Sequence, residues 1–265
     1  MTMQRGMKPR RQAAVLPVPD SLRLSRTALL LDVDGTLLDI ATTPEGVVIP
    51  ETLRASLRSL LAVTGGAVAL VSGRTIAMLD ELFAPVKIPA IGGHGAEMRL
   101  TADGPIVKCH LPDLSDALRE RLHALSDIDS RLLVEDKLHS IAVHYRLARH
   151  HEDFLQEKIA NIVSRFDDPV EVLSGKAVIE VKPKDFNKGS AVLELMTHVP
   201  FSGRTPLFIG DDTTDEAVFA ILPELSGLGF SVGRMIEGAR GVIPSPEHVR
   251  SWLVALSTHA ERRAT

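Results

Sequence analysis

An apolar run that ends in two aspartates sets the strongest constraint on this chain. Residues 28–33 read Ala-Leu-Leu-Leu-Asp-Val, and Asp34 and Gly35 follow. Such a run is typical of a strand buried on both faces of a parallel sheet. Asp32 and Asp34 fall at the strand end, where residues two apart point to one side and where open parallel sheets bind ligands. The pair is therefore expected either to face one ligand or to cap an ordinary strand-to-loop turn.

A second acidic turn lies far downstream. Residues 206–210 predict another buried strand, and residues 211–216 follow it with the sequence Asp-Asp-Thr-Thr-Asp-Glu. Four carboxylates within six residues repel one another unless a cation or a basic side chain offsets their charge. Mg²⁺ takes oxygen ligands from a few carboxylates and a substrate phosphate, so the two turns are expected to converge on one metal ion. A helix N-terminus, which favours acidic residues, explains the second turn too, and both interpretations can hold together.

Composition excludes several classes of protein. Of the 265 residues, 45% are hydrophobic and 24% are charged, which suits a globular chain of one or two domains. The formal net charge of −4 gives no reason to expect a nucleic-acid partner, and no apolar run approaches the ~18 residues of a membrane span. A single cysteine, Cys109, excludes an intrachain disulfide. We therefore expect a cytoplasmic protein that binds neither nucleic acid nor membrane.

Apolar periodicity predicts a parallel core that is interrupted by a second layer. For the core we expect helices over about 51–62, 75–83, 188–197, 214–222 and 246–258, alternating with strands at 67–71, 88–92, 205–210 and 228–232. Two short strands within 96–108 predict a hairpin. For the second layer we expect helices at 113–126 and 151–166 with strands at 131–136, 140–146, 170–173 and 177–182. Paired strands with two helices indicate an α+β unit inserted into the doubly wound core.

The motifs of these turns resemble those of the haloacid dehalogenase superfamily of phosphotransferases. The resemblance is carried, in chain order, by Asp32-Val33-Asp34-Gly35-Thr36, Ser72-Gly73-Arg74, Asn187-Lys188-Gly189 and the turn at 210–216. With Gly92-Gly93-His94-Gly95-Ala96-Glu97 and Val134-Glu135-Asp136-Lys137, the chain is similar, more narrowly, to trehalose 6-phosphate phosphatases. The resemblance covers roughly residues 27–257.

This resemblance implies an α/β fold, with a Rossmann-like parallel-sheet core and an inserted, mobile α+β cap of αββαββ order (type C2B). The division that we expect comprises an N-terminal extension, disordered or loosely packed, at 1–26, a discontinuous core at 27–109 and 184–258, and a cap at 110–183.

The family's division of labour implies catalytic roles for Asp32, Asp34, Lys188 and Ser72, and a substrate-binding role for Arg74. Asp32 would be the nucleophile, which forms a mixed anhydride that water later cleaves, and Asp34 the general acid for the leaving sugar oxygen. Lys188 would neutralise phosphoryl oxygens, although a lone lysine is usually a solvated surface residue. Ser72 and Arg74 would hold phosphate at a turn with free backbone N–H groups, the alternative for Ser72 being a helix N-cap.

Mg²⁺ is the implied cofactor. Asp32, the backbone carbonyl of Asp34 and Asp211 would bind it together with a phosphate oxygen, and Asp212 or Asp215 would complete or support the site. The motif does not say which of the last two is a direct ligand.

Substrate recognition is expected from residues outside the acidic turns. The glycines around His94 let its backbone approach a ligand closely. Glu135, Lys137 and His139 alternate, and Glu180 is a lone acid in an otherwise apolar strand. The resemblance places sugar contacts near Glu135, Lys137 and Glu180, whereas a surface salt bridge between Glu135 and Lys137 is the simpler alternative.

We therefore predict a Mg²⁺-dependent phosphatase whose partner is a small sugar phosphate, trehalose 6-phosphate first. Phosphatases of sucrose, mannosylglycerate or hexose phosphates, a phosphomutase, and a non-catalytic phosphosugar-binding protein are the alternatives. The stretch Ser174-Gly175-Lys176-Ala177 does not complete a phosphate-binding GxxxxGK[ST] loop. The oligomeric state is left open, with a monomer favoured.

Overall fold

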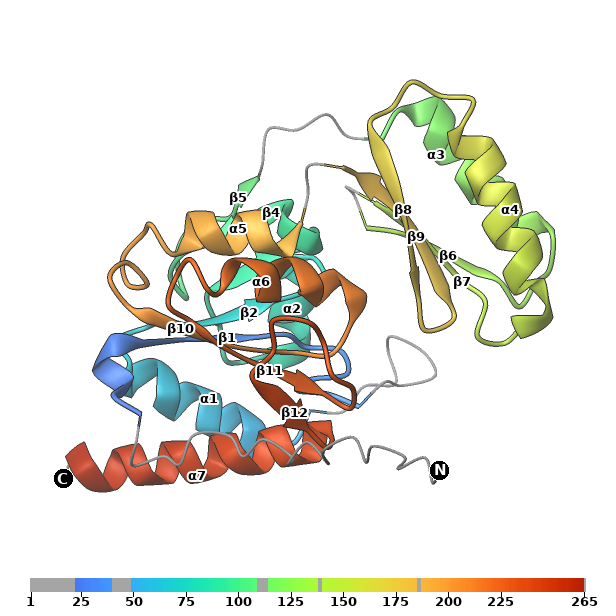
Figure 1. Cartoon of the computed structure of the whole chain (residues 1–265). Coiled ribbons are helices and arrows are strands. Elements are labelled where there is room, and N and C mark those ends of the chain that lie inside the picture. The colour runs from blue at the N-terminus through green and yellow to red at the C-terminus, as the bar shows by residue number, and fades with distance from the viewer. Residues whose placement is uncertain (1–21, 40–48, 109–113, 138–139, 185–186, 265) are drawn as a thin grey trace, which may run out of the picture.

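The computed structural model describes residues 22–39, 49–108, 114–137, 140–184 and 187–264. Within them the chain forms an eight-stranded sheet and a separate four-stranded sheet, each covered by helices (Figure 1). Most of the expected extension, Cys109, His139 and part of the expected domain boundaries lie outside the described residues. The division into domains therefore stays a prediction, whereas the two sheets are the expected α/β core and α+β cap.

The core sheet has the order β12-β11-β10-β1-β2-β3-β4-β5 and is parallel from β12 to β3, with β4 and β5 antiparallel. Its strands are β1 Thr27–Leu31, β2 Val68–Val71, β3 Ala90–Gly92, β4 Glu97–Arg99, β5 Val107–Lys108, β10 Thr205–Gly210, β11 Leu228–Val232 and β12 Gly241–Ile243. The parallel part brings the ends of β1, β2 and β10 to one edge, where ligands bind in such sheets.

Strand β1 is apolar from Ala28 to Leu31 because both of its faces are covered. Leu29 and Leu31 pack into one hydrophobic cluster, and Leu30 packs into another on the opposite face. The first cluster contains residues of α1 Glu51–Val63, α2 Ile76–Phe83 and α7 Pro246–Ala264; the second contains residues of α5 Lys188–Leu195 and α6 Glu216–Ile221. Completely buried leucines on both faces hold β1 at the centre of the core.

The cap sheet has the order β6-β7-β9-β8 and is entirely antiparallel. Its strands are β6 Leu133–Asp136, β7 Ile141–His144, β8 Val170–Gly175 and β9 Val178–Pro183, and its helices are α3 Asp116–His123 and α4 Glu152–Val163. Ile141, Val143 and Val181 pack with the two helices in a hydrophobic cluster of their own. Since side chains alternate between faces, Glu135, Ala142 and Glu180, which share one row of the pairing, lie on the other face.

Most expected elements are present, with small shifts of their ends. The strands predicted at 205–210 and 228–232 are confirmed, as is the hairpin of β4 and β5. The prediction missed β12, and α7 continues to residue 264 rather than ending at 258. The helix expected at 214–222 begins as the 3₁₀ turn η7 Thr213–Asp215 and continues as α6. Among the described residues, no helix combines the length and the apolar character that a membrane crossing demands.

Candidate active site

The two acidic turns meet at the edge of the core sheet. Asp32 follows β1 and Asp211 follows β10, and these parallel strands are neighbours that pair Leu31 with Ile209. The backbone N–H of Asp32 donates to the carbonyl of Ile209 at 2.9 Å, which continues the ladder to the point where both acids begin. Turns about 180 residues apart in the chain are thus adjacent, as the sequence predicts.

Three carboxylates and one ammonium group are buried together at this edge. Asp32, Asp211 and Asp215 each offer an oxygen atom within 4.8 Å of the others, and all three are at most 4% exposed. Lys188 Nζ lies 2.7 Å from Asp32 Oδ1 and 2.7 Å from Asp215 Oδ1. Lys188 is therefore a buried counter-ion and not the solvated surface lysine of the alternative interpretation.

The second acidic turn is also a helix start, which confirms one of its two interpretations. The Asp212 side chain accepts a hydrogen bond from the N–H of Thr213 at 2.7 Å and forms a capping box with Asp215. Asp215 Oδ2 accepts the N–H groups of Asp211 and Asp212 at 2.8 and 3.0 Å. Asp215 belongs to the buried three-acid group, and Asp212 does not.

The electrostatics of this group suit a cation. Burial and the neighbouring Asp215 raise the pKa of Asp32 well above its ordinary value, against the opposing effect of Lys188. Burial also raises the pKa of Asp211. Burial alone would lower the pKa of Lys188, but the Asp215 and Asp32 carboxylates raise it overall. Negative charge thus exceeds what Lys188 offsets.

Two carboxylate oxygens of the group, Asp32 Oδ2 and Asp211 Oδ1, are buried and have no hydrogen-bond partner. Unpartnered buried oxygens are costly, and hard divalent cations bind such ligands. Gly35 has a φ of +90°, and a Cβ atom there would overlap the Asp211 carboxylate, so only glycine allows this close approach. The residues present therefore fit a metal ion.

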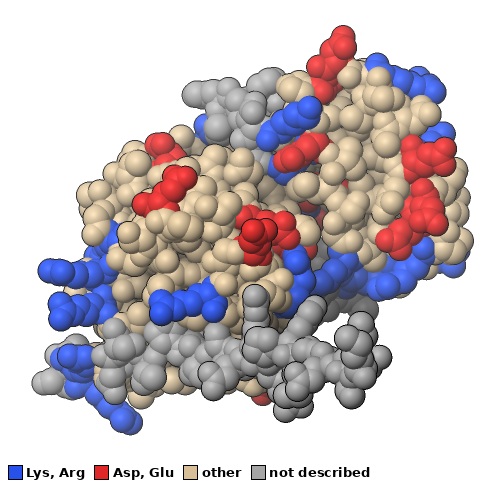
Figure 2. Space-filling model, in the orientation of Figure 1, with Lys and Arg blue, Asp and Glu red and all other residues tan. Residues whose placement is uncertain are grey.

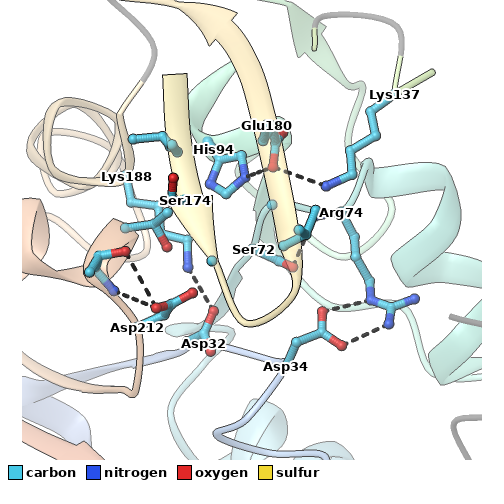
Figure 3. Close-up of a pocket in the computed structure, with 16 residues that line it drawn as sticks. Asp32, Asp34, Ser72, Arg74, His94, Lys137, Ser174, Glu180, Lys188 and Asp212 are labelled. Atoms are coloured by element: carbon cyan, nitrogen blue, oxygen red, sulfur yellow. Dashed lines mark hydrogen bonds and ion pairs between the residues drawn. The ribbon is translucent and has the colours of Figure 1, made fainter. Parts of the chain in front are cut away.

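Asp34 points away from the three-acid group and pairs with Arg74. The guanidinium donates two hydrogen bonds, Nε to Asp34 Oδ2 and Nη2 to Oδ1, each at 2.7 Å (Figure 3). The Ser72 hydroxyl accepts the N–H of Arg74 at 3.1 Å, whereas the N-cap of α2 is Thr75. Ser72 is therefore not the cap of that helix, and Arg74 fixes the direction of the Asp34 carboxylate.

The cap contributes a buried polar cluster above this edge. Glu180 Oε2 lies 3.0 Å from His94 Nε2 of the core and 3.2 Å from Lys137 Nζ, and the Ser140 hydroxyl donates to Oε1 at 2.5 Å. Against burial, which would raise it, His94 and Lys137 hold the pKa of Glu180 well below its usual range. A Cβ atom at Gly73 would overlap the His94 ring, so this glycine leaves room for the core–cap contact.

Glu135 and Lys137 have different partners. Lys137 pairs with Glu180, and Glu135 Oε2 lies 2.9 Å from His144 Nε2 of the next strand. The alternative prediction, a surface salt bridge between Glu135 and Lys137, is therefore wrong. Lys137 and Glu180 line the pocket between core and cap, and Glu135 lies outside that lining. A role for Glu135 in sugar binding stays a prediction.

One cap residue that contacts the acids of the core was not predicted from the sequence. Lys176, in the turn between β8 and β9, donates from Nζ to Asp211 Oδ2 at 2.9 Å, and its side chain is 60% exposed. The only signal was a basic residue in a predicted hairpin turn, which does not reveal which part of the core it contacts. Ser174 and Gly175, at the end of β8 just before this turn, line the pocket.

The pocket joins the two parts of the molecule. Its lining comprises Asp32, Asp34, Ser72, Gly73, Arg74, His94, Lys137, Leu173, Ser174, Gly175, Val178, Glu180, Lys188, Asp212, Thr213 and Thr214. Acidic and basic side chains also gather where the core meets the cap in the space-filling view (Figure 2). On the core side the pocket is lined by carboxylates and Lys188, and on the cap side by the hydrogen-bonding groups of Lys137, Ser174 and Glu180. Groups of the second kind suit a polyhydroxy ligand.

Comparisons with known proteins point to one family. A sequence model of the trehalose-phosphatase family matches residues 30–241. A probable trehalose-phosphate phosphatase of Sinorhizobium fredii is 40% identical over 239 residues, which are 89% of this chain and 90% of that protein. The trehalose-6-phosphate phosphatase of Escherichia coli is 35% identical over 93% of each chain. The solved structure of the C-terminal domain of a Candida albicans trehalose-6-phosphate phosphatase aligns with 94% of this chain and over 99% of its own length. The TM-score is 0.80 at 23% sequence identity, which shows that the two share a fold.

Proposed function

We propose, since the chain belongs to the trehalose-phosphatase family, that it hydrolyses trehalose 6-phosphate to trehalose and phosphate with Mg²⁺. The observation that carries the proposal is the buried Asp32 carboxylate. Lys188 Nζ donates to Asp32 Oδ1 at 2.7 Å, whereas Asp32 Oδ2 has no hydrogen-bond partner. Asp32 also lines the pocket between core and cap. A phosphate monoester is a poor electrophile because its negative charge repels the nucleophile. An active site for its hydrolysis must therefore supply a nucleophile for the phosphorus and positive charge that neutralises the phosphate oxygens.

Asp32 is the proposed nucleophile. Its carboxylate oxygen attacks phosphorus, the bond to the sugar oxygen breaks, and an aspartyl phosphate forms that water then cleaves. Lys188 keeps the carboxylate oriented through Oδ1 and neutralises phosphoryl charge that develops beside it. Asp215, through its own contact with Lys188, positions that ammonium group.

Asp34 is the proposed general acid and later the base for water. It lies two residues beyond Asp32 and its side chain is directed elsewhere, so it can meet the leaving oxygen while Asp32 meets phosphorus. The two hydrogen bonds from Arg74 fix that direction. Arg74 and Ser72 also line the pocket, and we propose that they contact the phosphate.

For Mg²⁺, the proposed ligands are Asp32, the backbone carbonyl of Asp34 and Asp211, with Asp215 close by and Asp212 supporting the turn. When bound, the ion offsets the negative charge of the acids and of the transferred phosphoryl group. The unpartnered oxygens of Asp32 and Asp211 support this assignment.

The sugar is proposed to bind beneath the cap. His94, Lys137 and Glu180 present a donor–acceptor cluster to the pocket, and Glu135 lies on the same face of the cap sheet. An uncharged disaccharide is recognised through its hydroxyl groups, which need both donors and acceptors. The proposed partner is thus a small sugar phosphate. We also propose that the enzyme is cytoplasmic and monomeric.

The experiment is phosphate release from a panel comprising trehalose 6-phosphate, sucrose 6-phosphate, mannosylglycerate phosphate, glucose 6-phosphate and an aryl phosphate, with Mg²⁺ and with chelator. The proposal predicts the highest kcat/KM for trehalose 6-phosphate and loss of turnover with chelator. A higher kcat/KM for another sugar phosphate would mean that this compound, and not trehalose 6-phosphate, is the substrate. If no member of the panel releases phosphate, the result would favour a non-catalytic binding protein.

A further inference from the structure

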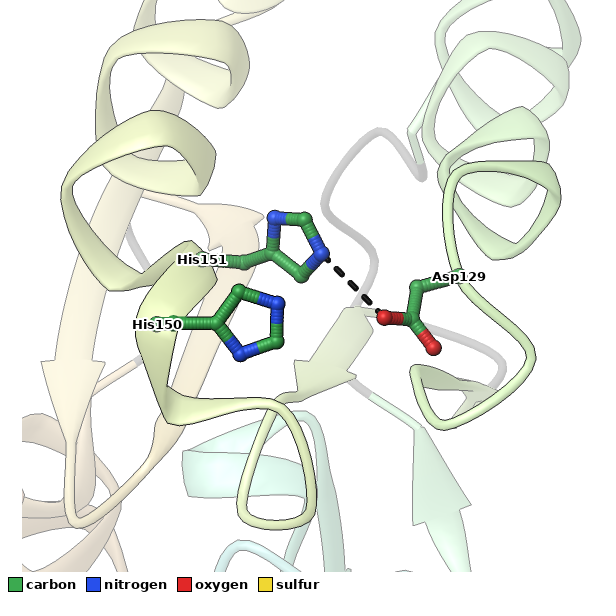
Figure 4. Close-up of side chains that lie close together, drawn as sticks. All are labelled: Asp129, His150 and His151. Atoms are coloured by element: carbon green, nitrogen blue, oxygen red, sulfur yellow. Dashed lines mark hydrogen bonds and ion pairs between the residues drawn. The ribbon is translucent and has the colours of Figure 1, made fainter.

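A cluster of metal-ligating side chains lies in the cap, outside the proposed active site. Asp129 belongs to the turn that precedes β6, and His150 and His151 belong to the 3₁₀ turn η6 Arg149–His151 that precedes α4 (Figure 4). Each of the three offers one ligand atom, and these atoms lie within 4.8 Å of one another. None of the three residues lines the pocket between core and cap.

Two of the ligand atoms lie close to the separation that one bound ion requires. His151 Nε2 lies 3.2 Å from Asp129 Oδ2. Ligands bound to a tetrahedral zinc ion at ~2.0–2.2 Å are roughly 3.3–3.5 Å apart. The ring centroid of His150 is 4.1 Å from that of His151, with the ring planes tilted by 40°. Both imidazoles project to one side of the turn, toward Asp129 (Figure 4), and the ligand atoms of all three residues lie within 4.8 Å of one another.

The Asp129 carboxylate is fixed by Arg131. Oδ1 accepts the backbone N–H and Nε–H of Arg131 at 2.9 and 3.0 Å, and Oδ2 accepts Nη2–H at 2.7 Å. Such outer contacts orient ligating carboxylates in metal sites. The same contacts hold the pKa of Asp129 well below its usual range. The positive charge of Arg131 also opposes a cation, so the affinity is expected to be lower than in a closed structural zinc site.

A second histidine–aspartate pair in the cap provides a comparison, because it has no third ligand beside it. His123 Nε2 lies 3.2 Å from Asp136 Oδ2, and Arg119 donates to Asp136 Oδ1 at 2.7 Å. The distance and the arginine partner therefore match those of His151, Asp129 and Arg131. Among the described residues, this pair is not part of a three-ligand cluster. It is an ordinary hydrogen-bond contact between an imidazole and a carboxylate.

We infer that Asp129, His150 and His151 form a second cation site, specific for a borderline divalent ion such as Zn²⁺. Two imidazole nitrogens and one carboxylate oxygen are a donor set that suits Zn²⁺ and not Mg²⁺, which prefers oxygen ligands throughout. The fourth position is left to water. The ion would link the turn before β6 to the start of α4 and so stiffen the helix layer of the cap.

The test is calorimetric titration of the full chain with Zn²⁺, in excess Mg²⁺ so that the acidic site in the core is occupied. We expect one Zn²⁺ per chain, and at least about ten-fold weaker binding in His150→Asn and in His151→Asn. His123→Asn is the matched control and should bind like the wild type. As a second readout, Zn²⁺ should raise the Tm of the wild type and of His123→Asn more than that of His150→Asn.

Co²⁺ provides a spectroscopic check, because its visible absorption intensifies when nitrogen and oxygen ligands surround it in a four-coordinate site.

His150 is exposed, so its variant should fold like the wild type, and equal Tm values without zinc would verify this. The inference is overturned if Zn²⁺ does not bind, if His150→Asn binds as tightly as the wild type, or if His123→Asn weakens binding as much as His150→Asn does.

Discussion

Replacing Lys188 by methionine should destabilise the fold, and by an amount that depends on pH. The Lys188 side chain is 3% exposed, and its Nζ lies 2.7 Å from an oxygen of Asp32 and 2.7 Å from an oxygen of Asp215. The substitution would leave both carboxylates buried without this counter-ion. Removing one partner of a buried ion pair costs about 3–5 kcal/mol of unfolding free energy, so we expect a loss of that size at neutral pH.

The pH dependence follows from Asp32. Its pKa is already raised, and Lys188 is the neighbour that opposes the rise. Without Lys188 the pKa rises further, so the folded variant binds a proton more tightly than the unfolded chain does. A raised folded pKa gives stability that is present at low pH and lost as the pH rises. The variant should therefore recover stability as the pH falls from neutral toward the ordinary pKa of an aspartate, about 3.9, and Mg²⁺ should restore part of it at neutral pH.

Urea unfolding can measure this through tryptophan fluorescence. The chain has one tryptophan, Trp252, which lies in α7 and is 9% exposed. The control is Lys158→Met, which removes an exposed lysine of α4 and should leave the unfolding midpoint unchanged. A loss below about 1 kcal/mol for Lys188→Met, without dependence on pH or Mg²⁺, would refute the reasoning.

Three further predictions follow from the cap contacts. Lys137→Ala should lower kcat/KM on trehalose 6-phosphate at least about ten-fold, or roughly 1.4 kcal/mol, and leave an aryl phosphate unaffected; equal losses on both would contradict a sugar contact. Lys176→Ala removes an ammonium group 2.9 Å from Asp211, so the Mg²⁺ concentration for half-maximal activity should fall a few-fold, and a rise would count against this competition. Burial lowers the pKa of His94, although Glu180 opposes this, and a lowered folded pKa gives stability that is lost as the pH falls below about 6.5. On acidification, the unfolding midpoint of His94→Gln should accordingly drop less than that of the wild type. If the midpoints of the two proteins fall in parallel with pH, His94 is not a source of this acid sensitivity.

The parts of the fold that local pattern determines were predictable. The run before Asp32 is apolar because helices cover β1 on both faces, and this coverage leaves a signature in a single short stretch. The meeting of Asp32 with Asp211 was predictable too, since parallel strands place their carboxyl ends at one edge. Lys188 was identified from its helix start, although its buried contacts with two acids could not be inferred.

Contacts between distant side chains were not predictable, because no local pattern encodes them. Arg74 and Asp34 are 40 residues apart, and their pairing depends on how β1 and β2 are placed. The partner of Glu135 follows from the register between β6 and β7, which a sequence does not state. Lys176 reaches Asp211 only because the cap lies over the core. Strand β12 has three residues, too few to show a periodicity.

The central claim is that Asp32 attacks the phosphorus of trehalose 6-phosphate. The most direct measurement compares phosphate release from this substrate by the wild type and by Asp32→Asn in saturating Mg²⁺, with Tm values to verify that the variant is folded. An amide is a far weaker nucleophile than a carboxylate, so the variant should lose turnover by several orders of magnitude. Near-normal phosphate release by a folded Asp32→Asn protein would contradict the account.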